Sequence, residues 1–405
     1  MKCSAAFIYS DEYTQYHFHT HHPFNQKRVR LTVDLLKEAN ALTDEQIIKP
    51  RLATDEELAM IHDKAYIKAV KAAEKGELSE EKAVEFGLGT EDTPIFKGMH
   101  RAAALMAGGS LSAVDAVLEG NSEHALNLGG GLHHGFQRKA SGFCIYNDAA
   151  ITIQYIRKHY NLKVLYVDTD AHHGDGVQWA FYDDPNVCTF SIHETGRYLF
   201  PGTGNVNERG VREGYGSSYN IPLDAFTEDD SFLEIYETAM KEITEHFRPD
   251  IIVTQNGADA HAFDPLTHLC GTMHIYESIP ALAHELAHKY CNGKWIALGG
   301  GGYDIWRVVP RAWAQIWNIM SINQTSRGSL PAKWLDKVQQ EAPVPLPQKW
   351  QDNNDIYQPI PRKNDISEKN HQTLKKALQF IENQKKFKNG LFQTKKNSMT
   401  CFSSH

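Results

Sequence analysis

Six short apolar runs rich in β-forming residues recur along the first three quarters of the chain, separated by amphipathic stretches with helical periodicity. Strands that alternate with helices build βαβ units, in which the strands are parallel and helices cover the sheet. The pattern therefore predicts an α/β fold with a single large open parallel sheet and helices on both faces. The predicted strands are residues 3–9, 124–130, 163–170, 187–193, 250–257 and 295–303, and two of the predicted helices are 27–39 and 231–247.

The alternation of strands and helices ends at about residue 320. Residues 343–363 are rich in Pro, Gln and Asn, and one amphipathic helix is predicted after them at 368–386. We therefore expect one catalytic domain over residues 1–320 and an appended C-terminal extension over residues 321–405, instead of a second catalytic domain.

Charge is distributed unevenly along the chain. The net charge is −8, but residues 361–405 contain ten Lys or Arg against three Asp or Glu, which leaves −15 on residues 1–360. An acidic body is a poor binder of nucleic acid and attracts basic, lysine-rich partners. The basic end of the chain is expected to be solvated, without a specific role.

The six cysteines are scattered without a CxxC pair, which indicates a reducing compartment and argues against a disulfide scaffold or a thiolate zinc site. No uninterrupted apolar run approaches the ~18 residues that cross a bilayer. Residues 3–10 lead straight into Asp11 and Glu12, without the features of a signal peptide. We expect a cytoplasmic protein that binds neither membranes nor nucleic acid. Nothing in the sequence indicates an oligomeric state.

The stretch YVDTDAHHGDG, residues 166–176, places three aspartates and two histidines at the end of a predicted strand. In an extended chain Asp168, Asp170 and His172 point to the same side, whereas His173 points away. Carboxylates crowded at the end of an apolar strand repel each other unless a cation binds or one of them takes up a proton. Asp and His ligands without Cys suit Zn²⁺ or Fe²⁺ in a catalytic site that keeps one position open for water.

A third metal ligand must come from the end of another strand. Asp259 follows the predicted strand 250–257 and is one candidate. His261 and Asp264 are rivals on chemistry alone, and these polar residues could instead cap a following helix.

A second group of ionisable residues lies in GGGLHHGF, residues 129–136, which also follows a predicted strand. Its two histidines, His133 and His134, can pair with Asp168 and Asp175. An imidazole paired with a carboxylate is more basic and fixed in tautomer, as a general acid/base beside a metal requires. Histidines that serve only the structure are the alternative.

A glycine-rich turn, LGGGGYD at residues 298–304, places Tyr303 at the same edge of the predicted sheet. A tyrosine hydroxyl there can stabilise an oxyanion, or the ring can simply cover the core. The glycine runs of this chain lack the GK[ST] ending of a phosphate loop and a complete GxGxxG context, so nucleotide binding is not expected.

Six motifs occur in a characteristic order and spacing: GGLHHGF, ASGFCIYNDAA, VDTDAHHGDG, FPGTG, QNGADA and LGGGGY. Together they resemble the zinc-dependent histone deacetylase family, whose members have an arginase-like fold. The resemblance runs from about residue 5 to residue 320, and the motifs are long and mutually consistent.

The resemblance implies a catalytic role for residues that match the family motifs. The implied zinc ligands are Asp170, His172 and Asp259. The implied general base and acid is His134, paired with Asp175, and its electrostatic partner is His133, paired with Asp168. Tyr303 matches the tyrosine that polarises the substrate carbonyl.

The resemblance also implies a substrate tunnel and a second cation. Residues matching the tunnel, its rim and the presumed acetate exit are Phe143 and Phe200 as aromatic walls, Gly142 beside them, Leu266 near the mouth, Asp92 as the carboxylate that grips the substrate backbone, and Arg28 behind the zinc. The family holds a K⁺ ion through residues that match Asp168, Asp170, His172, Ser191 and the carbonyl group of Ile192.

The function implied by the resemblance is zinc-dependent hydrolysis of acetyl-lysine in an acetylated protein substrate, with acetyl-CoA synthetase as the expected substrate of a bacterial member. The alternatives are an amidohydrolase of acetylpolyamines or other small amides, and a non-catalytic module that binds acyl-lysine. Tyr303 and the two Asp-paired histidines argue against the binding module, which needs neither. A binuclear manganese hydrolase is disfavoured, because its motif requires a carboxylate at the position of His173.

Overall fold

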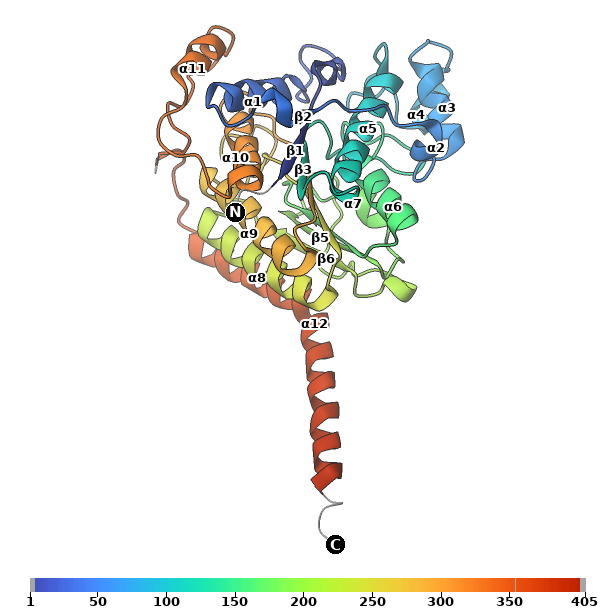
Figure 1. Ribbon diagram of the computed structural model, residues 1–405, viewed down its shortest axis with the longest axis vertical. Coiled ribbons are helices and arrows are strands. Elements are labelled where there is room, and N and C mark those ends of the chain that lie inside the picture. Colours follow the sequence, from blue (N-terminus) through green and yellow to red (C-terminus); the bar gives the residue numbers. More distant parts are fainter. Residues whose placement is uncertain (1–3, 354, 401–405) are drawn as a thin grey trace.

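A computed structural model describes residues 4–353 and 355–400 of the chain, with side chains as far as residue 387. Within these residues eight parallel strands form one sheet in the order β2-β1-β3-β8-β7-β4-β5-β6 (Figure 1). The predicted fold class is therefore confirmed. The strands are β1 Ala5–Ile8, β2 Ile47–Ile48, β3 His124–Asn127, β4 Val164–Asp168, β5 Val187–Glu194, β6 Ser218–Leu223, β7 Ile251–Gln255 and β8 Trp295–Leu298.

The two strands that the sequence pattern missed, β2 and β6, are the two edges of the sheet. β2 has only two residues, too few to form a recognisable apolar run. β6 contains Pro222, which argues against a central strand because proline cannot donate a ladder hydrogen bond. An edge strand tolerates proline, since one side of its backbone has no strand to bond.

Helices cover both faces of the sheet, as expected (Figure 1). On one face α5 packs on β1, β3 and β8, and α6 packs on β4; on the other, α10 packs on β1 and β3, α9 on β7 and β8, and α8 on β5. The helices are α1 Lys27–Glu38, α2 Asp55–Leu58, α3 Lys64–Ala73, α4 Glu80–Glu85, α5 Met99–Leu118, α6 Asp148–Tyr160, α7 Asp175–Ala180, α8 Asp229–Phe247, α9 Met273–Cys291, α10 Val309–Ile322, α11 Ala332–Gln339 and α12 Lys363–Thr400.

The central strands are apolar on both sides because both faces are buried. Successive residues of β4 illustrate this: Leu165 and Val167 lie in one core cluster, whereas Val164 and Tyr166 lie in the other. Continuous apolar runs of this kind are typical of parallel sheets between two helix layers. The strands therefore end abruptly where polar residues begin, and those ends position the site described below.

One helix of the described chain, α5, is long and apolar enough to cross a membrane by length and composition. It is interrupted by His100, Arg101 and Asp115, and 83% of its most apolar window is buried inside the protein. Burial of this extent is typical of a core helix in a soluble protein.

The C-terminal extension begins by packing on the body of the protein. In α11, the indole of Trp334 is buried and donates to the carbonyl oxygen of Leu31 on α1 at 3.1 Å. Further along, Asp352 bonds Arg311 of α10 and lies 2.9 Å from Nε2 of His261. Residues 332–352 are therefore joined to the body by buried contacts.

The first half of α12 lies along α8 and β6, and its second half extends away from the body (Figure 1). The buried residues of its first half recur at helical spacing on one face, as predicted for an amphipathic helix: Ile366, Asn370, Leu374, Ala377, Leu378 and Ile381. Asn370 joins α12 to α8 and to the segment before it by hydrogen bonds. It accepts from the backbone NH of Asp224 and donates to Thr227 and Ser231.

Three lysines of the extension have acidic partners on the body, contrary to the expectation that the basic charges would be solvated without a role. Lys363, Lys369 and Lys385 form ion pairs with Glu228, Asp224 and Glu242, respectively. The acidic residues lie on or just before α8, so α12 places opposite charges side by side. A count of charges along the sequence cannot reveal such a pairing, because it depends on the docking of α12.

Candidate active site

The carboxyl ends of β8, β7 and β4 lie side by side in the middle of the sheet. Their last residues are in register, because Asp168 is opposite Gln255, which is opposite Leu298. The segments that follow these strands therefore converge on one place, as in other open parallel sheets. The candidate site is built from these segments and from the loop that follows β3.

The segment after β4 turns back on itself instead of continuing as a strand. The backbone NH of Asp170 donates to the carboxylate of Asp168 at 3.1 Å, and the NH of His172 donates to the carboxylate of Asp170 at 3.0 Å. Such bonds from the backbone to an aspartate two residues earlier are typical of tight turns. The three side chains therefore meet through turns, and not through alternation along an extended strand.

Asp170, His172 and Asp259 form a compact group, with one potential ligand atom from each residue within 4.8 Å of the others. Nδ1 of His172 lies 3.0 Å from Oδ1 of Asp170 and 3.0 Å from Oδ2 of Asp259. The three residues are 1%, 7% and 0% exposed, respectively. Two carboxylates and an imidazole thus lie together in a buried site.

The backbone around this group leaves room for nothing larger than glycine. A Cβ atom at Gly301 would lie 2.1 Å from Oδ2 of Asp259, and one at Gly257 would lie 2.5 Å from Oδ2 of Asp170. The NH of Gly301 and the amide of Gln255 both donate to Oδ2 of Asp170, at 2.6 and 2.7 Å. Donors that orient carboxylates in this way are a usual feature of metal sites.

The donor set fits a divalent transition metal. Burial and the charge of Asp170 raise the pKa of Asp259 to about 6, so the two carboxylates destabilise each other when both are ionised. A divalent cation removes that repulsion, and Asp and His without Cys suit Zn²⁺ or Fe²⁺. Residues Asp170, His172 and Asp259 could hold such an ion and leave a position for water.

The two rivals of Asp259 have other partners. His261 lies 2.9 Å from the carboxylate of Asp352, and Asp264 accepts hydrogen bonds from the backbone NH groups of Leu266 and Tyr303. His173 is turned away from the group and lies 2.8 Å from the hydroxyl of Thr203.

His133 and His134 lie next to the group, with their ring centroids 4.0 Å apart. Nδ1 of His133 is 2.7 Å from Oδ2 of Asp168, and Nδ1 of His134 is 2.7 Å from Oδ1 of Asp175. Both histidines are buried, and each carboxylate fixes the orientation of one imidazole. The structure brings together both pairs that the sequence suggested.

The two histidines differ in their affinity for a proton. Burial lowers the pKa of His133, but the charges of Asp168 and Asp170 outweigh it and raise the pKa to about 9. For His134, burial and the positive charge of His133 lower the pKa despite the pairing with Asp175. His134 is thus the better candidate for a neutral imidazole that accepts a proton.

Several residues that hold the histidine loop in place were not singled out from the sequence. The carboxylate of Asp148 accepts from the NH groups of Gly131 and Leu132, and the amide of Asn147 donates to the carbonyl oxygens of His133 and Gly135. A signal for both was available, because an Asn-Asp pair before an apolar helical run is typical of a helix start.

Tyr166 is a further supporting residue that the sequence did not reveal. Its hydroxyl donates to Oδ2 of Asp168 at 2.8 Å, beside the bond from that oxygen to His133. No sequence signal marks it, because Tyr166 reads as one more apolar residue of a buried strand.

Aromatic side chains border the group on two sides. The ring of Phe143 meets that of Tyr303 edge to face at 5.8 Å, and the ring of Phe200 meets that of His134 at 5.0 Å. Phe200 is 45% exposed, so it lies at the surface of the site. Gly142 has a φ of 52°, and a Cβ atom there would lie 2.4 Å from Cδ2 of His134. Glycine is therefore required for this wall to approach the histidine.

Arg28 is fully buried, close enough to Asp259 and Asp170 for their charges to act on its guanidinium. Its guanidinium donates to the carbonyl oxygen of Gly302 at 2.8 Å and lies between the rings of Phe24 and Trp313. Its Nη2 atom has no hydrogen-bond partner. Burial lowers the pKa of Arg28, although the charges of Tyr303, Asp259 and other acidic groups oppose this effect. A buried cation with a spare donor is suited to a small anion.

The remaining candidates lie around the group. Asp92 accepts from the NH of Gly142 at 2.7 Å, so its carboxylate is at the same wall as Phe143. Leu266 is partly exposed in the segment after Asp264. Ser191 of β5 is opposite Asp168 in the sheet and is followed by Ile192, so the predicted K⁺ ligands lie on adjacent strands.

Comparisons with known proteins identify the family and the fold of the chain. Residues 22–320 match the model of the histone deacetylase domain. The chain is 61% identical over 380 residues to the acetoin utilization protein AcuC of Bacillus subtilis, which covers 94% of this chain and 98% of that protein. It is 48% identical over 365 residues to AcuC of Staphylococcus aureus, covering 90% of this chain and 94% of that protein.

Solved structures give the same result. The fold matches a histone deacetylase homologue from Aquifex aeolicus with a TM-score of 0.80 and 30% identity, covering 91% of this chain and 99% of that one. A structure of such a homologue complexed with SAHA matches equally well. Sequence and fold thus agree, and the chain belongs to the histone deacetylase family.

Proposed function

We propose that the protein is a metal-dependent hydrolase that removes acetyl groups from lysine side chains of proteins. The observation that carries this proposal is the position of two Asp-paired histidines beside Asp170, His172 and Asp259. A binding module needs no such pairs, whereas amide hydrolysis needs a group that accepts and returns a proton.

The bound metal would be Zn²⁺, or Fe²⁺, held by Asp170, His172 and Asp259. When bound, it would polarise the acetyl carbonyl and increase the acidity of a water molecule. A K⁺ ion beside Asp168 and Ser191 would further neutralise the crowded end of β4.

His134 would accept the proton of the attacking water as the new C–O bond forms at the acetyl carbon. It would then give this proton to the lysine nitrogen as the C–N bond breaks, so that acetate and a lysine amine are released. Asp175 holds Nδ1 of His134 at 2.7 Å and leaves Nε2 for this transfer. His133, whose pKa is raised to about 9, would add positive charge near the developing oxyanion.

Tyr303 would donate a hydrogen bond to the carbonyl oxygen as negative charge develops there. Burial and the charges of Asp259 and Asp170 raise the pKa of Tyr303 well above its usual value, so the hydroxyl keeps its proton. One donor of this kind typically contributes about 10²-fold to 10³-fold in rate. The bond from its backbone NH to Asp264 fixes the segment that carries the ring.

The walls of the site would select the acetylated side chain. Phe143 and Phe200 would enclose the aliphatic stem of the substrate lysine, with Gly142 beside them and Leu266 at the mouth. A neutral acetyl-lysine enters an apolar passage at lower cost than a lysine ammonium. Asp92 would accept a hydrogen bond from the substrate backbone, and Arg28 would attract the acetate product.

The substrate would be an acetylated protein in the cytoplasm. The AcuC relatives are named for acetoin utilization, and acetyl-CoA synthetase is the first candidate in such a setting. The net charge of −15 on residues 1–360 favours a partner with a lysine-rich surface.

Acetate release tests the proposal. An acetyl-lysine peptide and N-acetylputrescine are offered to the protein at equal concentrations, and the released acetate is measured. Faster hydrolysis of the peptide supports the proposal. Faster hydrolysis of N-acetylputrescine would favour a small-molecule amidohydrolase, and peptide binding without acetate release would favour a binding module. Acetylated proteins in lysates with and without the enzyme then identify the substrate.

A further inference from the structure

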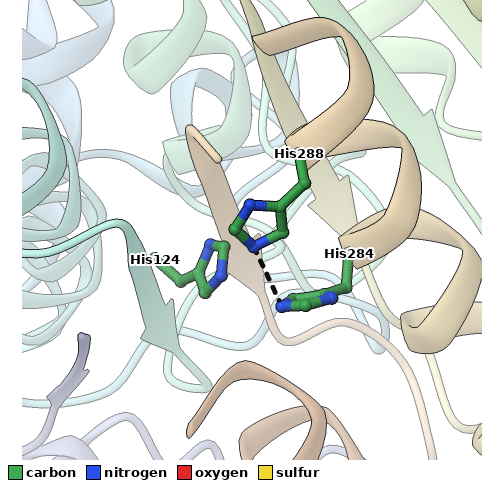
Figure 2. A group of neighbouring side chains, drawn as sticks. All are labelled: His124, His284 and His288. Carbon is green, nitrogen blue, oxygen red and sulfur yellow. Dashed lines mark hydrogen bonds between the residues drawn. The ribbon is translucent and has the colours of Figure 1, made fainter. Parts of the chain in front are cut away.

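Three histidines meet at the end of the sheet opposite the candidate active site. His124 is the first residue of β3, and His284 and His288 lie near the C-terminal end of α9 (Figure 2). His124 is in register with Trp295, the first residue of β8, so the cluster lies at the amino ends of the strands. The active-site residues lie at the carboxyl ends, so the two sites are separated by the length of the strands.

The three imidazole rings are close enough to share one ion. Their ring centroids are 4.4–5.1 Å apart, and one nitrogen from each ring lies within 4.8 Å of the others. The Nε2 atoms of His284 and His288 are 3.1 Å apart, shown by the dashed line in Figure 2. Two imidazole nitrogens bound to one tetrahedral Zn²⁺ at 2.0–2.1 Å lie about 3.3 Å apart. That pair is therefore already close to the spacing of two metal ligands.

His124 supplies an independent indication of a ligand. Its side chain is fully buried, yet neither ring nitrogen has a hydrogen-bond partner of normal geometry. Backbone groups of Gly293 and Glu123 approach the ring and raise its pKa, but less than burial and the neighbouring histidines lower it. A buried imidazole normally satisfies its nitrogens, so this ring, directed at two others, lacks a partner that a cation could provide.

Two of the three rings, His124 and His284, also have lowered pKa values, which favour the neutral form that metal binding requires. Burial and the neighbouring His284 and His288 lower the pKa of His124 to about 3, and burial together with His288 lowers that of His284 to about 4. Neutral imidazoles keep a lone pair for a metal at neutral pH, whereas imidazolium ions do not.

The sequence around α9 has a spacing suited to this role. His284 and His288 belong to the segment HELAH, and residues four apart on a helix lie on the same side. His288 is exposed, which gives an ion access from solvent. Glu123 is exposed next to His124. Its charge partly opposes the lowering of the pKa of His284, so a carboxylate is near the rings.

We propose that His124, His284 and His288 form a second metal site, which binds Zn²⁺ or a similar transition-metal ion and joins the end of α9 to the start of β3. Imidazole ligands suit Zn²⁺, Co²⁺, Ni²⁺ and Cu²⁺, whereas Mg²⁺ and Ca²⁺ prefer oxygen. The fourth position is left to water or to Glu123. The site contributes to stability and takes no part in the hydrolysis.

Metal stoichiometry tests this site in the full-length protein. Metal-free protein is dialysed against a low concentration of Zn²⁺, and the bound ions per chain are counted for the wild type, Asp259→Asn, His288→Ala and the double variant. We expect two, one, one and none, respectively. His274→Ala, which removes an exposed histidine of the same helix, is the matched control and should bind two.

Two further readouts identify the site. Zn²⁺ should raise the melting temperature of Asp259→Asn, and the rise should disappear when His288→Ala is added. Co²⁺ bound to Asp259→Asn should give visible bands with intensities typical of imidazole coordination. His124→Gln should lose both signals, and His288→Ala should keep the acetate release of the wild type if the chain is a deacetylase.

The inference fails if His288→Ala and His124→Gln bind as much Zn²⁺ as the wild type. In that case the three rings form only a hydrogen-bonded histidine cluster. The test is independent of the proposed function. If the active site binds no metal, the wild type binds one ion and His288→Ala binds none, which still supports the second site.

Discussion

Nδ1 of His134 lies 2.7 Å from Oδ1 of Asp175, and both side chains are buried. The same carboxylate oxygen accepts the backbone NH of Gly176 at 2.9 Å, so Asp175 is itself held in place at the start of α7. A fixed carboxylate determines which nitrogen of the imidazole carries the proton. The pair therefore determines whether Nε2 of His134 can accept a proton from water.

Asp175→Asn should lower kcat for acetyl-lysine hydrolysis by about 10²-fold to 10⁴-fold, the usual contribution of general acid–base catalysis. The asparagine can hold the ring but does not stabilise the imidazolium that forms during the reaction. Steady-state kinetics on a peptide check this result, with metal content measured in parallel. An unchanged kcat would show that His134 does not act as the base.

Tyr303→Phe should retain the metal and lose about 10²-fold to 10³-fold in kcat, because only the donor to the developing oxyanion is removed. The ring of Tyr303 meets that of Phe143 edge to face, and phenylalanine preserves this packing. Kinetics with equal metal content in both proteins provide the measurement. If the variant hydrolyses the peptide at the rate of the wild type, the tyrosine serves the structure alone.

Gly142→Ala should abolish most of the activity, because its Cβ atom would lie 2.4 Å from Cδ2 of His134 and displace the ring. Gly76→Ala is the matched control. Gly76 also has a positive φ, of 72°, but a Cβ atom there meets nothing within 4 Å. Both variants should lose some stability from backbone strain, and only Gly142→Ala should lose acetate release. Equal activities would mean that the wall tolerates a methyl group.

Asp352→Ala should lower the free energy of unfolding by about 3–5 kcal/mol, as is usual when one partner of a buried ion pair is removed. The side chain of Asp352 is 5% exposed and pairs with Arg311 and His261. The exposed Asp355→Ala is the control and should have little effect. Urea unfolding at pH 7 measures both variants. A loss as small as that of the control would show that the extension contributes little through this contact.

The contribution of Asp352 should depend on pH. Burial raises the pKa of Asp352, but the bond with His261 and the charges of His261 and Arg311 outweigh it and hold the pKa well below its usual value. The stabilisation is therefore complete above the unfolded carboxyl pKa of about 3.9 and is lost as the pH falls through the lower folded value. The difference in the free energy of unfolding between wild type and Asp352→Ala should therefore shrink as the pH falls below about 4.

The sheet was predictable because six of its strands are buried on both faces and read as apolar runs. β6 escaped prediction because Pro222 and a mixed composition suit an edge. The crowding of Asp168, Asp170 and His172 was also evident from the sequence, although turns and not an extended strand bring them together.

Other features depend on contacts between distant segments. Nothing near Asp259 in the sequence distinguishes it from His261 and Asp264; the resemblance to the family did so, and the structure gives His261 another partner, Asp352, from the extension. The pairing of Lys369 and Lys385 of α12 with Asp224 and Glu242, which lie before and on α8, likewise depends on how the extension docks. The meeting of His124 with α9 depends on the order of strands in the sheet.

Metal dependence tests the central claim most directly. Acetate release from an acetyl-lysine peptide is measured before chelation, after removal of metal, and after addition of Zn²⁺ or Fe²⁺, for the wild type and Asp259→Asn. We predict that the activity of the wild type disappears on chelation and returns with either ion, whereas Asp259→Asn stays inactive throughout. Activity that survives complete removal of metal, or a fully active Asp259→Asn, would contradict the account.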